Sequence, residues 1–121
     1  SASFVFISSI SAQHPYKGGS LYAASKAALE SFSRSIALEF SSKGVRSNCI
    51  SAALVETEMF EKTKNALSET ELLGILSSYP LGIGKPMDVA HASAFLLSNQ
   101  SSWMTGTTIT LDGGLLLNTK K

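Results

Sequence analysis

Short apolar runs alternate along this chain with longer segments in which apolar side chains recur at every third or fourth position. Residues 3–8, 45–51 and 107–111 are predicted as strands, and the continuous apolar run at 3–8 is typical of a strand buried on both faces of a parallel sheet. Residues 21–41 are predicted as a helix, because apolar side chains line one face of this segment: Leu29, Phe32, Ile36 and Phe40.

Capping residues set the expected bounds of the helices. Ser20 can cap the helix over 21–41, and Gly44 is a suitable stop after it. Ser68 and Glu71 have the S-x-x-E spacing of a capping box, so residues 57–78 are predicted to form two short helices that separate near Leu67.

The last predicted helix runs from Pro86, which suits a first helical turn, to about residue 98. Its inward face is expected to carry Val89, Ala92, Phe95 and Leu96. The connections between successive strands are longer than the dozen or so residues that a parallel crossover requires. Right-handed crossovers would place helices on both faces of the sheet, so the predicted fold class is α/β with a parallel sheet.

Composition narrows the classes of protein that fit. The 121 residues carry a formal charge of +1 with no basic stripe, which argues against a nucleic-acid partner. No apolar run reaches the roughly 20 residues of a membrane helix, so we expect no membrane partner and a cytoplasmic location. The single cysteine, Cys49, is expected to be a small buried residue, and no group of His, Cys, Asp and Glu has the spacing of a metal site.

Three residues carry the chemistry that the sequence suggests. Tyr22 and Lys26 are four apart on the predicted helix, so they share a face close to its positive N-terminal end. A phenol beside an ammonium can exchange a proton near neutral pH. Ser9 follows the first strand, at the sheet edge where open α/β folds bind ligands, and can hydrogen-bond a reacting carbonyl oxygen.

Several motifs together resemble the short-chain dehydrogenase/reductase family, and the resemblance covers almost the whole chain in the family's order. The carriers are Ile7-Ser8-Ser9, Tyr22-Ala23-Ala24-Ser25-Lys26, the strand at 44–51, Leu54-Val55-Glu56-Thr57, Pro80-Leu81-Gly82, Lys85 to Ala90, and Thr105 to Gly114. The resemblance implies the C-terminal part of a Rossmann-like, doubly wound parallel sheet. Within the family, the chain resembles 3-oxoacyl-[acyl-carrier-protein] reductase-like members.

The resemblance also implies a role for each catalytic candidate. Tyr22 would be the general acid/base, Lys26 would hold the nicotinamide ribose and favour the phenolate of Tyr22, and Ser9 would orient the carbonyl or alcohol. Tyr22, Lys26, Ala53, Val55 and Thr57 would contact the cofactor, Val55 through its backbone and Thr57 through its hydroxyl. The implied cofactor is NADP or NAD, since the residue that chooses between them lies outside this segment.

By the same resemblance the substrate is a small carbonyl or alcohol, or an acyl thioester, and the protein is a homodimer or homotetramer. Subunits would associate through the helix at 21–41 and the strand at 107–111. The helices within 57–78 would form a movable substrate lid, although simple helix packing is the alternative. His14 lies in the loop beside the proposed site and can contact substrate.

Two departures from the family pattern qualify these expectations. Ala52-Ala53 stands where the family usually has Pro-Gly, which makes this turn less rigid and adds a methyl group beside the cofactor. The glycine-rich turn and the N-terminal dinucleotide-binding half have no counterpart, so residues 1–121 are expected to be one partial domain with a bare edge at 3–8. We therefore expect the isolated chain to be inactive. The alternative is a non-catalytic assembly or dimerisation module. An epimerase or dehydratase of the family's extended branch shares Tyr-x-x-x-Lys, but the few residues after Asp112-Gly113-Gly114 argue against the larger C-terminal domain of that branch.

Overall fold

The computed structural model describes residues 1–118 and contains one parallel sheet with strand order β1-β2-β3. The strands are β1 (Ala2–Ser9), β2 (Val45–Ala52) and β3 (Thr108–Leu111), each within two residues of its predicted bounds. The register pairs Ala2 with Val45 through Ser9 with Ala52, and Cys49 with Thr108 through Ala52 with Leu111. The predicted α/β class is confirmed.

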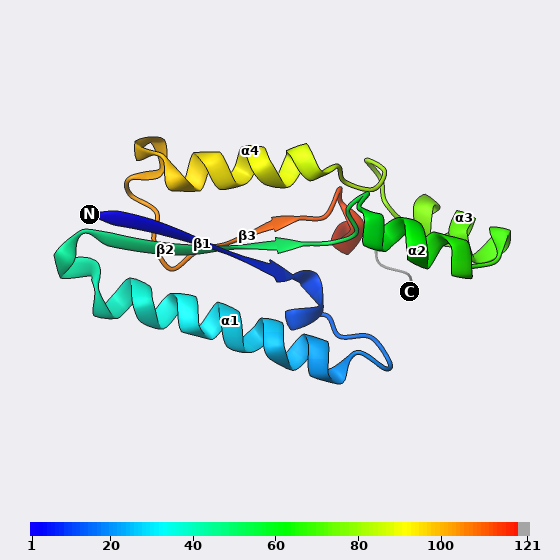
Figure 1. Ribbon diagram of the computed structural model, residues 1–121, viewed down its shortest axis with the longest axis horizontal. Helices are drawn as coiled ribbons and strands as arrows, with labels where there is room; N and C mark the ends of the chain where they lie inside the picture. The colour runs from blue at the N-terminus through cyan, green and yellow to red at the C-terminus, as the bar shows by residue number, and fades with distance from the viewer. Residues whose placement is uncertain (119–121) are drawn as a thin grey trace.

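Helices cover both faces of this sheet, as predicted (Figure 1). Helix α1 (Ser20–Glu39) lies on one face and α4 (Pro86–Leu97) on the other. Side chains confirm the two layers, because Ser33 on α1 hydrogen-bonds Ser47 on β2 across 2.8 Å. On the opposite face, the Ser3 hydroxyl donates to the carbonyl of Leu96 in α4 at 2.8 Å.

The start of α1 differs from the prediction. Gly19, not Ser20, occupies the N-cap position, and no side chain caps the helix. The Tyr16 ring lies so close to Gly19 that a Cβ there would come within 2.5 Å of a ring carbon. A larger residue at position 19 would require the exposed Tyr16 ring to move, and Ser20 is the first helical residue. The predicted end of the helix lies too far along the chain, because α1 ends at Glu39 with Phe40 as its C-cap. Gly44, whose φ of +72° favours glycine, instead ends the short 3₁₀ turn at Ser41–Lys43.

The predicted apolar face of α1 is only partly covered by residues 1–118. The helix residues that are fully buried are Glu30, Ser33 and Ala37, whereas Phe32 is 55% exposed. Phe32 packs edge-on against Phe6 of β1, with ring centroids 5.9 Å apart. Part of the predicted apolar stripe therefore remains uncovered by the described sheet.

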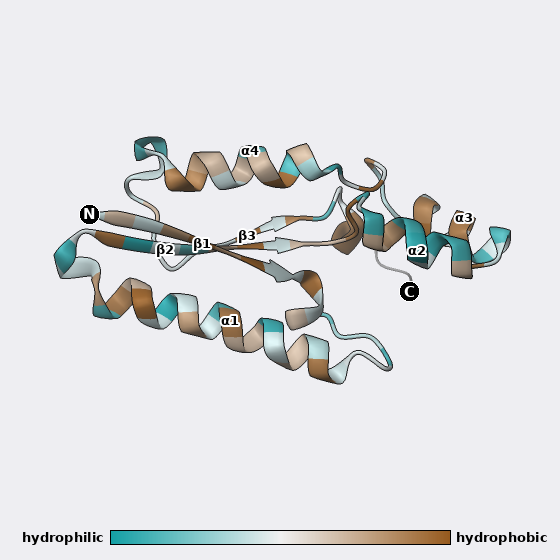
Figure 2. Cartoon of the chain, viewed as in Figure 1, coloured by the Kyte–Doolittle hydropathy of each residue, from teal (hydrophilic) through white to brown (hydrophobic). Residues whose placement is uncertain are grey.

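Burial is deepest around β2, the central strand. Cys49 and Ile50 are 1% and 0% exposed, and burial raises the pKa of the Cys49 thiol, so its prediction as a buried small residue is confirmed. Figure 2 shows apolar ribbon along β1 and much of α4. In α4, Leu96 is fully buried as predicted. Phe95 is 39% exposed, contrary to prediction, because neighbouring helical residues point about 100° apart.

Two short helices lie beyond the carboxyl ends of the strands (Figure 1). They are α2 (Glu58–Ala66) and α3 (Glu69–Ser77), and they separate at Leu67 as predicted. The capping box is confirmed: the Glu71 carboxylate accepts the Ser68 N–H at 3.0 Å, and the Ser68 hydroxyl accepts the Glu71 N–H at 3.1 Å. The short 3₁₀ turns are η1 (Ile10–Ala12), η2 (Ser41–Lys43), η3 (Asn99–Ser101) and η4 (Leu115–Leu117).

The expected bare edge is present in the described part of the chain, where β1 pairs only with β2. On β1, Phe4 is 46% and Ile7 43% exposed. Within residues 1–118, no helix combines the length and the apolar character needed to cross a membrane. The end of the C-terminal tail, 119–121, lies outside the described residues.

Candidate active site

Ser9 is the last residue of β1 and also caps the turn that follows. Its hydroxyl oxygen accepts the Ser11 N–H at 3.2 Å and the Ser11 hydroxyl at 2.9 Å. Both contacts use Ser9 as an acceptor, and a hydroxyl also carries one donor hydrogen. The side chain is therefore held in place at the carboxyl end of β1 while its proton can still be donated to a ligand oxygen.

Tyr22 and Lys26 lie in the first two turns of α1, above the same end of β1. The Lys26 ammonium lies 5.6 Å from the centroid of the Tyr22 ring and donates to the carbonyl of Ile7 at 3.1 Å. The Tyr22 side chain remains exposed. Lysine thus links the tyrosine-bearing turn to the strand two residues before Ser9. No hydrogen bond within residues 1–118 joins Ser9 directly to Tyr22 or Lys26.

The loop after β2 is anchored by hydrogen bonds on both sides of Val55. Ala53 donates to the carbonyl of Leu111 at 2.9 Å, which fixes the start of the loop against the end of β3. Val55 then forms an isolated parallel bridge with Gly84, made by the N–H of Gly84 to Leu54 at 3.0 Å and the N–H of Glu56 to Gly84 at 2.8 Å.

In a parallel bridge of this kind, the N–H and C=O of the central residue point away from its partner strand. Within the described residues, no hydrogen bond engages the N–H or C=O of Val55. An amide ligand has one donor and one acceptor and could satisfy both groups at once. The backbone of Val55 is consequently suited to bind a primary carboxamide.

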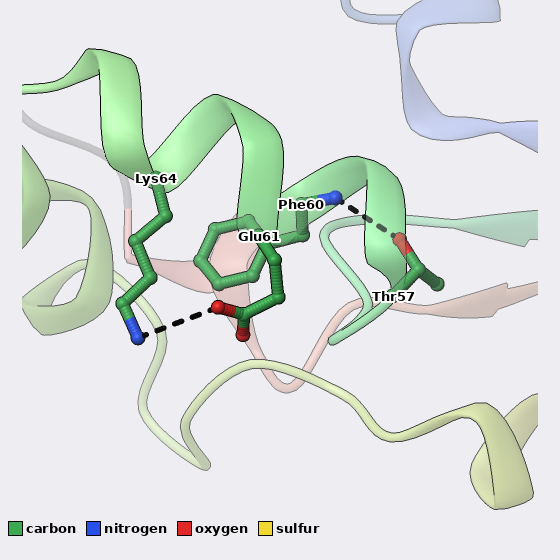
Figure 3. Close-up of polar contacts among 4 residues, drawn as sticks. All are labelled: Thr57, Phe60, Glu61 and Lys64. Atoms are coloured by element: carbon green, nitrogen blue, oxygen red, sulfur yellow. Dashed lines mark hydrogen bonds and ion pairs between the residues drawn. The ribbon is translucent and has the colours of Figure 1, made fainter.

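Thr57 is the N-cap of α2, and its hydroxyl oxygen accepts the Phe60 N–H at 3.2 Å (Figure 3). The hydroxyl hydrogen remains available to a ligand, as for Ser9. Figure 3 also shows the ion pair of Glu61 and Lys64 at 3.9 Å. Both of these side chains are about half exposed to solvent on the surface of α2, so this ion pair contributes little to the stability of the fold.

A cavity of about 430 Å³ lies beside the Val55 loop. It is bounded by the loop, the end of β3 and the start of α4, with Leu54, Val55, Leu81, Gly82, Ile83, Gly84, Asp88, Val89, Leu111, Asp112 and Gly113 in its walls. Asp112 accepts the N–H groups of Gly114 and Leu116 at 3.0 and 2.9 Å, so it builds the predicted turn after β3.

The structure adds two polar residues that the sequence did not single out. Glu30 is 2% exposed in α1, where its carboxylate accepts the Ser8 hydroxyl at 2.6 Å and the Gln13 amide at 3.4 Å. Its helix position looks like any surface acid, so only the packed sheet reveals it. Tyr79 is the other: its hydroxyl accepts the Leu54 N–H at 3.1 Å, a contact that joins residues 25 positions apart.

His14 lies away from the Val55 loop, in a second cavity of about 360 Å³ that Glu30 and Arg34 also line. Among the described residues, no group of His, Cys, Asp and Glu could hold a metal ion.

Comparison with known proteins places this arrangement in a family. The family model described as enoyl-(acyl carrier protein) reductase matches residues 1–116. A curated relative, the 3-oxoacyl-[acyl-carrier-protein] reductase FabG of Chlamydia muridarum, is 39% identical over 116 residues, which are 95% of this chain and 45% of the relative. The chain therefore spans about half the length of the curated relatives that it matches.

Solved structures agree with this assignment. A short-chain type dehydrogenase/reductase from Mycobacterium ulcerans matches with a TM-score of 0.86 at 33% identity, over 95% of this chain and 42% of that one. A short chain oxidoreductase from Pseudomonas aeruginosa PAO1, solved with NADPH and described as having an atypical catalytic center, matches with a TM-score of 0.83 at 34% identity, over 93% and 45%. The chain belongs to the short-chain dehydrogenase/reductase family of oxidoreductases and corresponds to the C-terminal part of its Rossmann-like fold.

Proposed function

We propose that the protein containing this chain is an NAD(P)-dependent oxidoreductase that interconverts a carbonyl and an alcohol, with Tyr22 as the general acid/base. The observation that carries the proposal is the position of Lys26, whose ammonium lies 5.6 Å from the Tyr22 ring and is bonded to the end of β1. A fixed positive charge beside a phenol stabilises its phenolate, which is the form left after the proton is donated.

The chain's own groups fit a dinucleotide whose nicotinamide supplies or accepts the hydride. The N–H and C=O of Val55, which have no partner among the described residues, can bind the carboxamide of the nicotinamide, and Ala53 lies beside them. The Thr57 hydroxyl has a hydrogen that it can donate to the cofactor. Lys26 would bind the ribose hydroxyls. A related solved structure holds NADPH, which supports a nicotinamide cofactor without choosing between NADP and NAD.

In the direction of carbonyl reduction, Ser9 donates its hydroxyl hydrogen to the carbonyl oxygen and orients the carbon for attack. As the carbonyl carbon gains the hydride, the oxygen takes a proton from the Tyr22 hydroxyl, and Lys26 stabilises the phenolate that results. Alcohol oxidation reverses these steps. We propose a small carbonyl or an acyl thioester as the substrate class, since 3-oxoacyl-[acyl-carrier-protein] reductases are among the relatives.

We also propose a movable lid and a contact between subunits, each from exposed apolar side chains. The apolar side chains Met59 and Leu73 are 79% and 60% exposed on α2 and α3, which suits a lid that closes on an apolar substrate. Leu38, 80% exposed on α1, suits a homodimer or homotetramer contact through that helix.

Replacing Lys26 tests the cofactor site. In the full-length protein, Lys26→Met should raise the Kd for NADPH or NADH by about tenfold or more, because a charge-assisted hydrogen bond contributes about 1.5–3 kcal/mol. Fluorescence titration measures this. Lys43→Met is a matched control, since Lys43 also lies over an aromatic ring, that of Phe40 at 5.9 Å, but at the far end of the helix. Equal affinities for wild type and Lys26→Met would contradict the proposal.

One observation favours a second reading, in which residues 1–121 alone are a non-catalytic assembly module. The outer edge of β1 has no partner among the described residues, and Phe4 and Ile7 are exposed there. We expect the isolated chain to bind NADPH and NADH no more tightly than millimolar and to associate through this edge. Micromolar binding by the isolated monomer in a titration would show that this expectation is wrong.

A further inference from the structure

Tyr79 lies directly after α3, and its hydroxyl reaches back to the loop that follows β2. The oxygen accepts the Leu54 N–H at 3.1 Å. The other hydrogen bonds that anchor residues 53–56 within the described chain join backbone groups, at Ala53, Leu54 and Glu56. Tyr79 is therefore the side chain on which the geometry of this loop depends.

The contact acts on Val55 through the backbone. The C=O of Leu54 and the N–H of Val55 belong to one planar peptide unit, so the orientation of Leu54 sets the direction of the Val55 N–H. Leu54 is held on both sides, since its N–H donates to Tyr79 and its C=O accepts the Gly84 N–H at 3.0 Å. The two bonds hold consecutive peptide units: the Tyr79 hydroxyl holds the Ala53–Leu54 unit, and the Gly84 N–H holds the Leu54–Val55 unit that carries the Val55 N–H. Removing the Tyr79 bond leaves the first unit without an anchor at its N–H, so the dihedral angles of Leu54 that aim the next unit are less restricted.

Tyr79 is itself held firmly enough to act as a support. Tyr79 is partly buried, and its carbonyl accepts the Gly82 N–H at 2.9 Å. Gly113 lies against the Tyr79 ring, so close that a Cβ added at Gly113 would be 3.7 Å from a ring carbon. Burial raises the pKa of Tyr79, and the nearby Asp112 carboxylate raises it further, although the Leu54 N–H opposes both effects. The phenol thus stays neutral at physiological pH and does not add a charge beside the loop.

The sequence explains why this loop needs such a support. The two residues that lead into the loop are Ala52 and Ala53, and neither fixes its backbone φ as a proline would. A hydrogen bond from a distant side chain can supply that rigidity. We propose that Tyr79 is a positioning residue that holds the Val55 backbone in the orientation that binds the nicotinamide carboxamide. This inference rests on the proposed cofactor function of Val55.

The test compares Tyr79→Phe with wild type in the full-length protein, with Ser3→Ala as a matched control. Ser3→Ala also removes one hydrogen bond between a side chain and a backbone group, but near the amino end of β1, at the opposite end of the sheet from the Val55 loop. The first readout, made without ligand, is hydrogen exchange at single amides. In Tyr79→Phe the Leu54 amide should exchange about tenfold faster, while the Ala53 amide, bonded to Leu111, should not change.

The second readout is affinity for two ligands: NADPH or NADH, whichever the wild type binds, and its matching ADP-ribose fragment without nicotinamide. Tyr79→Phe should raise the Kd of the whole dinucleotide about 3- to 10-fold, as expected for one hydrogen bond, and should leave the fragment's Kd unchanged. Ser3→Ala should change neither Kd. This difference separates positioning of the nicotinamide loop from general loss of stability.

Each contrary outcome has a distinct meaning. Unchanged exchange at Leu54 overturns the Tyr79 inference and leaves the proposed function standing. Faster exchange with an unchanged dinucleotide Kd, or with equal weakening of both ligands, also overturns the positioning role. Failure of the wild-type protein to bind either dinucleotide overturns the proposed function, and with it the role of Tyr79 in cofactor binding.

Discussion

At the scale of single residues, buried polar contacts join distant segments: the Glu30 carboxylate accepts the Ser8 hydroxyl at 2.6 Å, and the Tyr79 hydroxyl accepts the Leu54 N–H at 3.1 Å. The Y-x-x-x-K pair and Ser9 stand out in the sequence because their types and spacing are those of proton-transfer chemistry. Glu30 and Tyr79 do not, since their partners Ser8 and Leu54 are brought to them only by the folded sheet. The sequence predicts Ser20 as the cap of α1, but a local turn, in which the Gly19 N–H donates to the Tyr16 carbonyl at 3.1 Å, brings Gly19 to the N-cap position.

Arg46 is another side chain whose role only the fold reveals. Its guanidinium donates to the carbonyls of Leu96, Ser98, Ser101 and Met104 and to the Ser101 hydroxyl, at 2.8–3.2 Å. It therefore joins β2 to the turn after α4.

Arg46→Lys should destabilise the full-length protein by about 2 kcal/mol, because one ammonium cannot satisfy acceptors that a planar guanidinium reaches. Urea denaturation measures the loss. Arg34→Lys is a control, because the Arg34 side chain is exposed at the wall of the second cavity and makes no hydrogen bond within residues 1–118; it should change stability by less than about 0.5 kcal/mol. Equal midpoints for wild type and Arg46→Lys would contradict the structural role assigned to Arg46.

At the scale of elements, the type and order of the helices and strands could be predicted from the sequence. The burial of the apolar side chains that they carry could not. The strands and the split at Leu67 follow from local patterns: apolar runs, the capping box at Ser68 and the proline at the start of α4. Coverage of an apolar stripe depends on what packs against it. Phe32 on α1 and Phe40 at its C-cap remain partly exposed because residues 1–118 contain no strand on the outer side of β1.

The capping box gives α3 a pH dependence with a definite sign. Hydrogen bonding from the Ser68 N–H, and then the Ser68 hydroxyl, lowers the pKa of the Glu71 carboxyl in the folded protein. A carboxyl with a lowered folded pKa stabilises the fold above its ordinary pKa of about 4.3 and loses this contribution as the pH falls through the lowered value.

Comparing the stability of Glu71→Gln with that of wild type across a range of pH tests this contribution of the capping box. The stability difference between the two proteins should be present at pH 7 and should shrink below about pH 4. Glu69→Gln, in the same helical turn but outside the capping box, should show a smaller dependence. Urea denaturation at each pH provides the measurement, and a difference that grows on acidification would contradict the assigned sign.

At the scale of the whole molecule, the chain spans about half the length of the curated relatives that it matches. It provides the carboxyl ends of three parallel strands, a tyrosine and a lysine on α1, and a loop with open backbone groups at Val55. Family membership follows from the match over residues 1–116. The relatives extend beyond the part of the fold that these residues match.

The central claim is that Tyr22 moves the proton while the hydride is transferred, and one substitution tests it most directly. In the full-length protein, Tyr22→Phe should slow the reduction of a 3-oxoacyl thioester such as acetoacetyl-CoA by about 10²–10⁴-fold, the range for loss of a general acid. The Kd for the dinucleotide should change by less than about threefold, because Lys26 and Val55 remain. A Tyr22→Phe protein that keeps turnover within a few-fold of wild type, at equal cofactor affinity, would contradict the account.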